Sequence, residues 1–276
     1  MLNTLSSFFY FYIPFNTQIA KLLALLFITI LFSSVGSFLN VCIYRIPLKL
    51  SIVKPGSFCP KCKTPIKAWH NIPVLSYFFL GGKCRHCKAT FSFRYCFVET
   101  ITAILAVLYF IKNGYALDLN YLKFVFFMCF AVMIFFIDID HRLILDKHNY
   151  TLIIAGLLFA LIGATHLFQA LIGAGIGFAI FYSIALIYWL IKKQVGLGGG
   201  DIKYITAVGM FTGIEGVIFT IFFSSIFGVL FNIINIGKEK EFAYAPYLVA
   251  ASLLYFFMGD SIIKWYLDMT FHMLTL

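Results

Sequence analysis

Charged residues are scarce in this sequence, and their scarcity excludes a soluble globular protein. Only 12% of the 276 residues are charged, whereas soluble domains carry about 25%. Hydrophobic residues make up 62% of the chain, and the mean hydropathy is +0.96. We therefore expect a polytopic membrane protein of the all-α class.

The sequence also lacks the features of a processed or multidomain chain. Residues 1–18 hold no basic segment, and no small-residue cleavage site precedes the first apolar run, so we expect an uncleaved entry segment. No internal repeat or low-complexity tract is present. The expected domains are an N-terminal segment with the first transmembrane helix at 1–43, a cytoplasmic basic loop at 44–97, and a larger transmembrane domain at 98–276.

Apolar runs predict about eight transmembrane helices. A hydrocarbon core of roughly 30 Å needs about 17–25 helical residues, and several runs are shorter, so their boundaries are approximate. With both chain ends outside, the expected spans are residues 22–43, 97–111, 121–137, 151–164, 170–191, 202–212, 217–236 and 242–258.

The loop at 44–97 contains no acid at all. It holds ten Lys and Arg residues and no Asp or Glu, so the positive-inside rule places it in the cytoplasm. A basic loop beside a bilayer fits anionic lipid headgroups, and we expect a lipid bilayer and no nucleic acid as its partner.

Two C-x2-C pairs lie in this loop, Cys59–Cys62 and Cys84–Cys87. Two such turns can close a tetrahedral zinc site, and cytosolic thiols stay reduced, which disfavours disulfides. Four free thiols remain the alternative. Cys42, Cys96 and Cys129 stand singly in apolar surroundings and are expected to be core residues.

Asp201 follows the glycine run 198–200, where one apolar helix ends and another begins. A glycine-rich helix start can cradle a phosphate, but no Ser or Thr follows Lys203 as a nucleotide loop requires. A solvated Asp on a cytoplasmic turn is the plainer alternative. The topology puts Asp138 on the same side of the membrane, also at a helix end.

An exposed, charged turn is expected next to Asp138. It comprises Asp140, His141, Asp146 and His148.

Two carboxylates that approach each other can perform acid–base chemistry. Repulsion and partial burial keep one of them protonated while the other ionises. The ionised acid can then take a proton from water as it attacks a carbonyl, and the protonated acid can donate to the leaving amine. The pair Asp138 and Asp201 is therefore a candidate for hydrolysis.

Several motifs, in order along most of the chain, resemble those of the type IV prepilin peptidase family. They are Gly36-Ser-Phe-Leu-Asn-Val-Cys-Ile-Tyr-Arg-Ile-Pro47, the two C-x2-C pairs, Asn71-Ile-Pro73, Arg94-Tyr95 with Val98-Glu99, Asp138-x-Asp-His141, Gly198-Gly-Gly-Asp201 with Lys203, and Ala245-Pro-Tyr-Leu248.

This resemblance implies a bifunctional bacterial inner-membrane enzyme of type IV pilus or type II secretion systems. One activity cleaves the basic leader of prepilin or pseudopilin precursors on the cytoplasmic face, with Asp138 and Asp201 as the catalytic aspartates. The other methylates the new N-terminus with S-adenosylmethionine. The zinc-type cysteines of the family correspond to Cys59, Cys62, Cys84 and Cys87, and residues 98–276 become an aspartic peptidase domain.

Some residues depart from the family's usual motifs, and the sequence contains no motif that would identify a methyltransferase site. Ile144-Leu145-Asp146 replaces a usual Leu-Pro-Asp, His70 replaces a frequent acid, and Cys96 replaces a common Pro. No glycine-rich methyltransferase motif is present, so methylation rests on the resemblance and the residues of the S-adenosylmethionine site are unknown.

The charge of the loop bears on how a basic leader would be recognised. Because the loop is basic, we expect acids to recognise the basic leader, with Asp140, Asp146, Glu239 and Glu241 as candidates and Asp140 or Asp146 as the contact.

Four other functions remain as alternatives to the bifunctional enzyme. They are a peptidase without methylation, a proton-coupled carrier with acids near the bilayer midplane, a presenilin-like protease, and a zinc-knuckle adaptor whose function would survive loss of Asp138 and Asp201.

Overall fold

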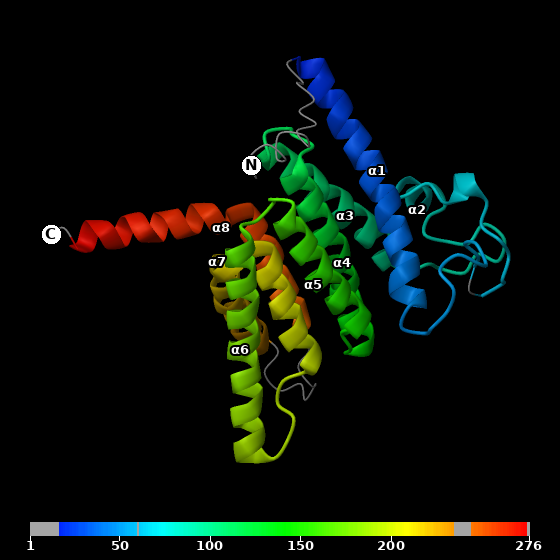
Figure 1. Cartoon of the computed structure of the whole chain (residues 1–276). Helices are drawn as coiled ribbons and strands as arrows, with labels where there is room; N and C mark the ends of the chain where they lie inside the picture. Colours follow the sequence, from blue (N-terminus) through cyan, green and yellow to red (C-terminus); the bar gives the residue numbers. More distant parts are fainter. Residues whose placement is uncertain (1–16, 60, 235–243, 275–276) are drawn as a thin grey trace. The chain divides into compact units, whose positions relative to one another are not determined.

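The computed structural model describes residues 17–59, 61–234 and 244–274, and helices dominate these ranges. The helices are α1 (Gln18–Arg45), α2 (Leu75–Phe79), α3 (Phe93–Lys112), α4 (Leu119–His141), α5 (Asp146–Leu161), α6 (Leu167–Lys192), α7 (Gly199–Ile234) and α8 (Ala245–Leu274), with a short 3-10 turn at Ala68–His70 (Figure 1). The described residues form no strand beyond two isolated bridges. The all-α prediction is confirmed.

Six of the described helices are long and apolar enough to cross a membrane, namely α1, α3, α4, α6, α7 and α8. The difference from the eight expected spans has two sources. Helix α5 has 16 residues, short for a span. The expected spans at 202–212 and 217–236 are two halves of α7, which breaks at Gly213 (φ 72°, ψ −165°). Residues 235–236 and 242–243 of the expected spans lie outside the described residues.

The chain divides into two compact units, whose described parts are residues 17–117 and 118–274. In the first unit, α1 packs along α3 at very short range. A Cβ on Gly36 would lie 2.7 Å from the Cα of Glu99, so only glycine permits this approach. One turn further along α1, Asn40 Nδ2 donates a 3.0 Å hydrogen bond to the carbonyl of Tyr95. These contacts bring the polar face of α1 against the start of α3.

In the second unit, α6 and α7 lie side by side (Figure 1) and touch through their backbones. A Cβ on Gly173 would lie 2.5 Å from the carbonyl carbon of Gly213, and one on Gly209 would clash with the backbone of Gly173. Gly177 meets the carbonyl of Ile205 in the same way. Each helix therefore presents a small-xxx-small pair, the spacing that allows close packing of membrane helices.

Aromatic side chains fill the space between α4, α7 and α8. The ring of Phe127 on α4 lies 6.3 Å from Tyr204 and 5.2 Å from Phe211, both on α7, and 5.1 Å from Phe256 on α8. The hydroxyl of buried Tyr204 is 2.8 Å from that of Ser252 on α8, which satisfies both groups. These contacts pack the interior of α4 against the first half of α7 and against α8.

A substitution at Gly173 tests the α6–α7 packing directly. We expect Gly173→Ala to destabilise the protein by about 1–3 kcal/mol, because the added methyl overpacks against the backbone of Gly213. The matched control is Gly175→Ala on the same helix, where nothing lies within 4 Å of the new Cβ. Thermal unfolding of the two detergent-solubilised variants compares them, and equal melting temperatures would contradict the packing described here.

Candidate functional site

Two buried carboxylates stand at helix ends in the second unit. Asp138 lies in the last turn of α4 and Asp201 in the first turn of α7, and their exposed fractions are 6% and 8%. The Oδ2 atom of Asp138 and the Oδ1 atom of Asp201 are buried without a hydrogen-bond partner. Buried polar atoms are normally satisfied, so two unpaired carboxylate oxygens mark these residues as a candidate functional pair.

The two carboxylates are close enough for their charges to interact. The negative charge of Asp138 acts on Asp201, and the positive charge of Arg142 acts on Asp138. Arg142 ends α4 in the left-handed conformation, with its N–H donating a 2.8 Å hydrogen bond to the carbonyl of Asp138. The structure thus brings together the two acids that the sequence selected.

Three contacts join the start of α7 to the start of α5 and so position Asp201. A Cβ on Gly200 would lie 2.7 Å from the Cβ of Ile144, which excludes any larger residue. Asn149 Nδ2 donates a 3.0 Å hydrogen bond to the carbonyl of Gly200. Lys203 Nζ forms a 2.6 Å ion pair with Asp146 Oδ1.

Asn149 was not singled out in the sequence, although it is fully buried. A buried Asn on a helix needs partners, but Asn149 stands in the polar stretch 146–151, so no local signal in the sequence marks it as buried. Its Oδ1 atom is buried without a partner. Asn149 therefore holds the glycine turn from one side and keeps an acceptor free on the other.

The charged turn near the acids is exposed only in part. Asp140, His141 and Asp146 are exposed as expected, but His148 is buried, and the prediction is wrong there. Its ring packs edge-on to Phe130 with 5.8 Å between centroids. The helical period turns position 148 inward, whereas the sequence signal was polarity alone. Glu239 and Glu241 lie outside the described residues.

The four loop cysteines form one cluster in the first unit. The sulfur atoms of Cys59, Cys62, Cys84 and Cys87 all lie within 4.8 Å of one another. The Cys59–Cys87 and Cys62–Cys84 sulfur pairs are 3.8 and 3.9 Å apart. Four sulfurs bound at about 2.3 Å to one tetrahedral ion lie about 3.8 Å apart, so these two pairs already have the spacing of a tetrahedral zinc site.

The two C-x2-C turns repeat one backbone conformation. The amides of Cys59 and Cys84 donate to the carbonyls of Thr64 and Ala89, at 3.0 and 2.8 Å. The residue after each pair, Lys63 or Lys88, has φ near +58° and donates back to the carbonyl of the first cysteine. Each turn thereby presents two sulfurs to the same point.

Local interactions act differently on the thiols of the cluster. The Thr64 hydroxyl, 3.3 Å from the sulfur, lowers the pKa of Cys62 to about 6, and the Thr64 backbone adds to the effect. The backbone amides of Cys87 and His86 lower the pKa of Cys84, whereas burial and the neighbouring cysteine thiols raise the pKa of Cys87 to about 11. Thiolates are the metal-binding form of cysteine, so a metal ion would bind Cys62 and Cys84 readily and would have to displace the proton of Cys87.

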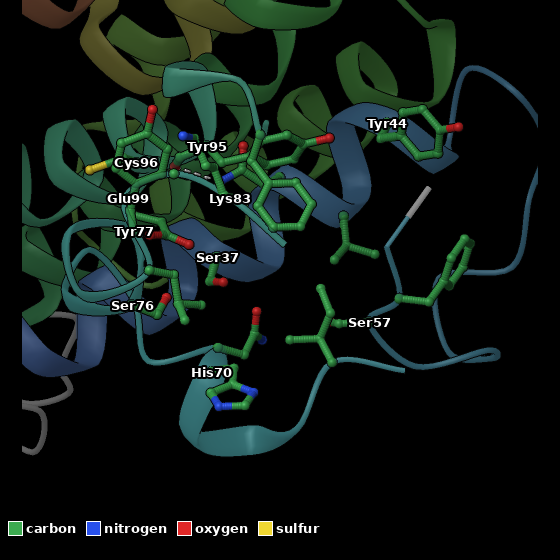
Figure 2. A pocket seen from close by; sticks show the side chains of 18 of the residues that line it. Ser37, Tyr44, Ser57, His70, Ser76, Tyr77, Lys83, Tyr95, Cys96 and Glu99 are labelled. Atoms are coloured by element: carbon green, nitrogen blue, oxygen red, sulfur yellow. Dashed lines mark hydrogen bonds between the residues drawn. The ribbon is translucent and has the colours of Figure 1, made fainter. Parts of the chain in front are cut away.

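A cavity of about 240 Å³ lies within the first unit, between α1, the cysteine turns and α3 (Figure 2). Glu99 of α3 lines it and accepts a 2.7 Å hydrogen bond from the amide of Val74. Val74 adopts φ 63° and ψ −55°, which is rare for a β-branched residue and costs about 1–3 kcal/mol. The fold therefore tolerates strain where it aims a backbone donor at a carboxylate.

With this geometry in hand, comparisons with known proteins place the chain in a family. Residues 30–113 match the bacterial peptidase A24 N-terminal domain, and residues 125–233 match the type IV leader peptidase family. Together these matches cover both units and most of the chain. The chain belongs to the type IV leader peptidase family.

Its relatives share one printed name, prepilin leader peptidase/N-methyltransferase. The chain is 33% identical to that of Neisseria gonorrhoeae, over 92% of this chain and 96% of the relative. It is 34% identical to that of Legionella pneumophila, with 85% and 91% covered, and 33% identical to that of Bacillus subtilis, with 85% and 94% covered. No solved structure matches the chain.

Metal analysis tests the cysteine cluster. The purified full chain should contain about one zinc ion per molecule, and Cys62→Ser should lose most of it. Acidification from pH 7 to pH 5 should release the metal, because the thiolates must take up protons. Cys129→Ser, which alters a thiol outside the cluster, serves as the control and should keep its zinc. Equal zinc content in the two variants would refute the site.

Proposed function

We propose that this chain is a bifunctional prepilin leader peptidase and N-methyltransferase. It cleaves the basic leader of type IV prepilin-like precursors with Asp138 and Asp201, and then methylates the new N-terminus with S-adenosylmethionine. The observation that carries the peptidase part is the pair of buried carboxylates, each with an unpartnered oxygen, at the ends of α4 and α7. The names of its relatives support both activities.

The two aspartates divide the acid and base roles in peptide hydrolysis. Like charges in a shared buried site favour one proton between them. The ionised carboxylate takes a proton from water as the water attacks the scissile carbonyl, while the protonated one donates a hydrogen bond to that oxygen. When the tetrahedral intermediate collapses, a proton passes to the leaving amine. The unpartnered Asp138 Oδ2 and Asp201 Oδ1 atoms are the natural positions for these exchanges.

Chain topology supports a cytoplasmic peptidase site in a bacterial inner membrane. The ten basic residues of 44–97 follow α1 and precede α3, so the positive-inside rule keeps this segment in the cytoplasm. Helix α3 then leads out, and α4 returns to end at Asp138. If the 16-residue α5 serves as a short span, α5 leads out, α6 returns, and α7 starts on the cytoplasmic side with Asp201.

Zinc at the four cysteines would have a structural role. Cys59, Cys62, Cys84 and Cys87 would hold the ion, and the ion would crosslink two turns of a loop that has little apolar core. Metal binding of this kind supplies folding free energy directly. The peptidase chemistry needs no step at this site, because Asp138 and Asp201 lie in the other unit.

Leader recognition would use acids on the cytoplasmic face. Asp140 and Asp146 are both exposed, and Asp146 forms a 2.6 Å ion pair with Lys203. Asp140 or Asp146 would contact a leader Lys or Arg. The hydrophobic part of the precursor would pack among the apolar spans.

Isosteric substitution of each aspartate tests the peptidase. Asp138→Asn and Asp201→Asn should each lower the cleavage rate of a basic-leader, Gly-Phe-junction precursor by at least about 10²–10⁴-fold, because each removes one acid–base group. Cleavage is measured in membranes, with insertion checked for every variant. Asp260→Asn, an exposed Asp of α8, is the matched control. Cleavage at the wild-type rate by either active-site variant would eliminate the paired-acid mechanism.

Asn149 should act as a positioning residue for Asp201. We expect Asn149→Ala to lower kcat by about a hundredfold with little change in KM, because a shift of about 1 Å in a catalytic group has this effect. Thr151→Ala, an exposed position on the same helix whose hydroxyl bonds only its own turn, is the control. A rise in KM at constant kcat would place Asn149 in substrate binding instead.

A further inference from the structure

The segment between α1 and α3 exposes large apolar side chains, most clearly on the short helix α2, where Phe78 and Phe79 are 67% and 85% exposed. The positive charge of this segment accounts for contact with lipid headgroups, but these rings need an apolar partner. We propose that α2 is a membrane anchor, whose outward face of Leu75, Phe78 and Phe79 inserts at the boundary between headgroups and acyl chains. The anchor is independent of both proposed activities, because it involves neither the two aspartates nor any ligand of the cavity.

Helix α2 has two different faces. Ser76 and Tyr77 line the cavity of the first unit (Figure 2). Leu75, Phe78 and Phe79 are 54%, 67% and 85% exposed instead. Positions three and four apart share a helix face, so Leu75 lies on the same side as the two rings. Single exposed apolar residues are common, whereas three large ones on one face indicate a contact surface.

Helix α2 lies beside the first turns of α3 rather than beyond its end. The amide of Val74, the residue before α2, donates a 2.7 Å hydrogen bond to Glu99 Oε2, and the ring of Tyr77 lies 5.8 Å from that of Phe93. Phe93 is the first residue of α3, and Glu99 lies about 9 Å further along the helix axis at a rise of 1.5 Å per residue. Helix α3 is long and apolar enough to cross a membrane, so α2 lies at the depth where this span enters the bilayer.

Contacts between α1 and α3 give the same depth. Gly36 abuts Glu99 and precedes the end of α1 at Arg45 by about 13 Å. Helix α1 has 28 residues and is therefore about 42 Å long, whereas the hydrocarbon core is about 30 Å thick. When α1 is centred in the bilayer, each end extends about 6 Å beyond the core. The attachment point of α2 then lies about 7 Å inside the core boundary, within the range of about 5–10 Å by which interfacial helices insert.

The backbone around α2 suits an environment that is poor in water. The N–H groups of residues 74–77 donate to Glu99 or to the carbonyls of residues 72–74, at 2.6–3.2 Å. Those of residues 80–83 donate to carbonyls of residues 76–80, at 2.8–3.3 Å. An unsatisfied backbone group is costly in a membrane, because no water replaces the missing partner. The hydrogen bond from Val74 to Glu99 therefore does for the start of α2 what water does for a loop in solution.

The outward face of α2 continues the lipid-facing side of α3. That side consists of residues 41–58% exposed that lie within about 60° around the helix axis at 3.6 residues per turn, namely Phe93, Phe97, Ile104, Leu108 and Ile111. Tyr77 of α2 packs edge-on against Phe93, the first of them, and the exposed Phe78 directly follows Tyr77. Acyl chains that cover this side of α3 would therefore also reach the rings of α2.

The charges near α2 fit anionic headgroups. Exposed cations flank the helix in the sequence, namely Lys67, Lys83, Arg85 and Lys88, and residues 44–97 contain no acid. Basic segments next to a span bind anionic lipids. Nζ of Lys67 lies 5.5 Å from the ring centroid of Trp69, which is 65% exposed, and Trp with a long cationic side chain is typical of the headgroup region. A protein partner would also cover the apolar face, but the cations and the depth of α2 favour the bilayer.

Fluorescence quenching in lipid vesicles tests the anchor on the full-length chain. The three Trp residues are replaced through Trp69→Phe, Trp189→Phe and Trp265→Phe, and Phe79→Trp then serves as the reporter at a side chain whose exposure leaves the packing unchanged. Lipids brominated near the headgroup end of the acyl chains should quench the reporter strongly. Lipids brominated near the methyl end should quench it weakly, because insertion by about 5–10 Å does not reach that depth. Acrylamide dissolved in the water should have little effect.

A second reporter on the first cysteine turn is the control. Lys61 is exposed between Cys59 and Cys62, and this turn follows residues 51–56, whose carbonyls Arg45 binds at the end of α1. In the same background, Lys61→Trp should be quenched by acrylamide and not by brominated lipids.

Three results would overturn the anchor. Quenching of Phe79→Trp by acrylamide alone would show a face open to water. Quenching by neither agent would show that a protein surface covers it, such as a second copy of the chain. Equal lipid quenching of both reporters would mean that the whole segment lies on the membrane and that α2 has no special part in it. None of these results depends on whether the chain cleaves or methylates a precursor.

Discussion

The proposed peptidase site, Asp138 with Asp201, depends on the absence of a side chain at Gly200. A Cβ there would lie 2.7 Å from Ile144, so any other residue would push the start of α7 away from the segment that follows Asp138. Because the glycine allows contact, its carbonyl reaches Asn149, and Lys203 one turn on reaches Asp146. The position of Asp201 thus follows from backbone contact, and the burial of both acids follows from that position.

Helices α6 and α7 of the second unit also approach each other closely through their backbones, and this packing restrains the helix that carries Asp201. Gly173 and Gly177 on α6 face Gly209 and Gly213 on α7, and the break at Gly213 lets the second half of α7 leave α6. In a bilayer, helices gain little from apolar burial against lipid-like partners, so van der Waals packing at short range must hold them. The helix that carries Asp201 is therefore anchored along its first half by α6 and at its start by α5.

Sequence patterns predicted the helical class, pointed to the four cysteines that cluster and singled out the two acids at helix ends, because each has a local signature. Metal binding by the cysteines and catalysis by the acids stay predictions. Hydropathy identifies long apolar helices, the C-x2-C spacing predicts a turn with two thiols, and an Asp after three glycines indicates a helix start with accessible backbone. Other features have no local signature. The start of α5 at Asp146 is polar and escaped the hydropathy pattern, and the break at Gly213 resembles any glycine in an apolar run. The partners of Asn149 and Glu99 lie 51 and 25 residues away, so only the fold reveals them.

The distribution of charge explains why the proposed leader recognition belongs to the second unit. Residues 44–97 carry ten positive charges and no acid, so this segment would repel a basic leader. In the second unit, Asp140 and Asp146 are exposed close in sequence to the buried Asp138. A leader held by those acids would bring the peptide bond that follows it toward the proposed catalytic pair, whereas a leader held at the basic segment would not. The scarcity of charge elsewhere in the chain therefore makes the few exposed acids after α4 the natural partners of a cationic leader.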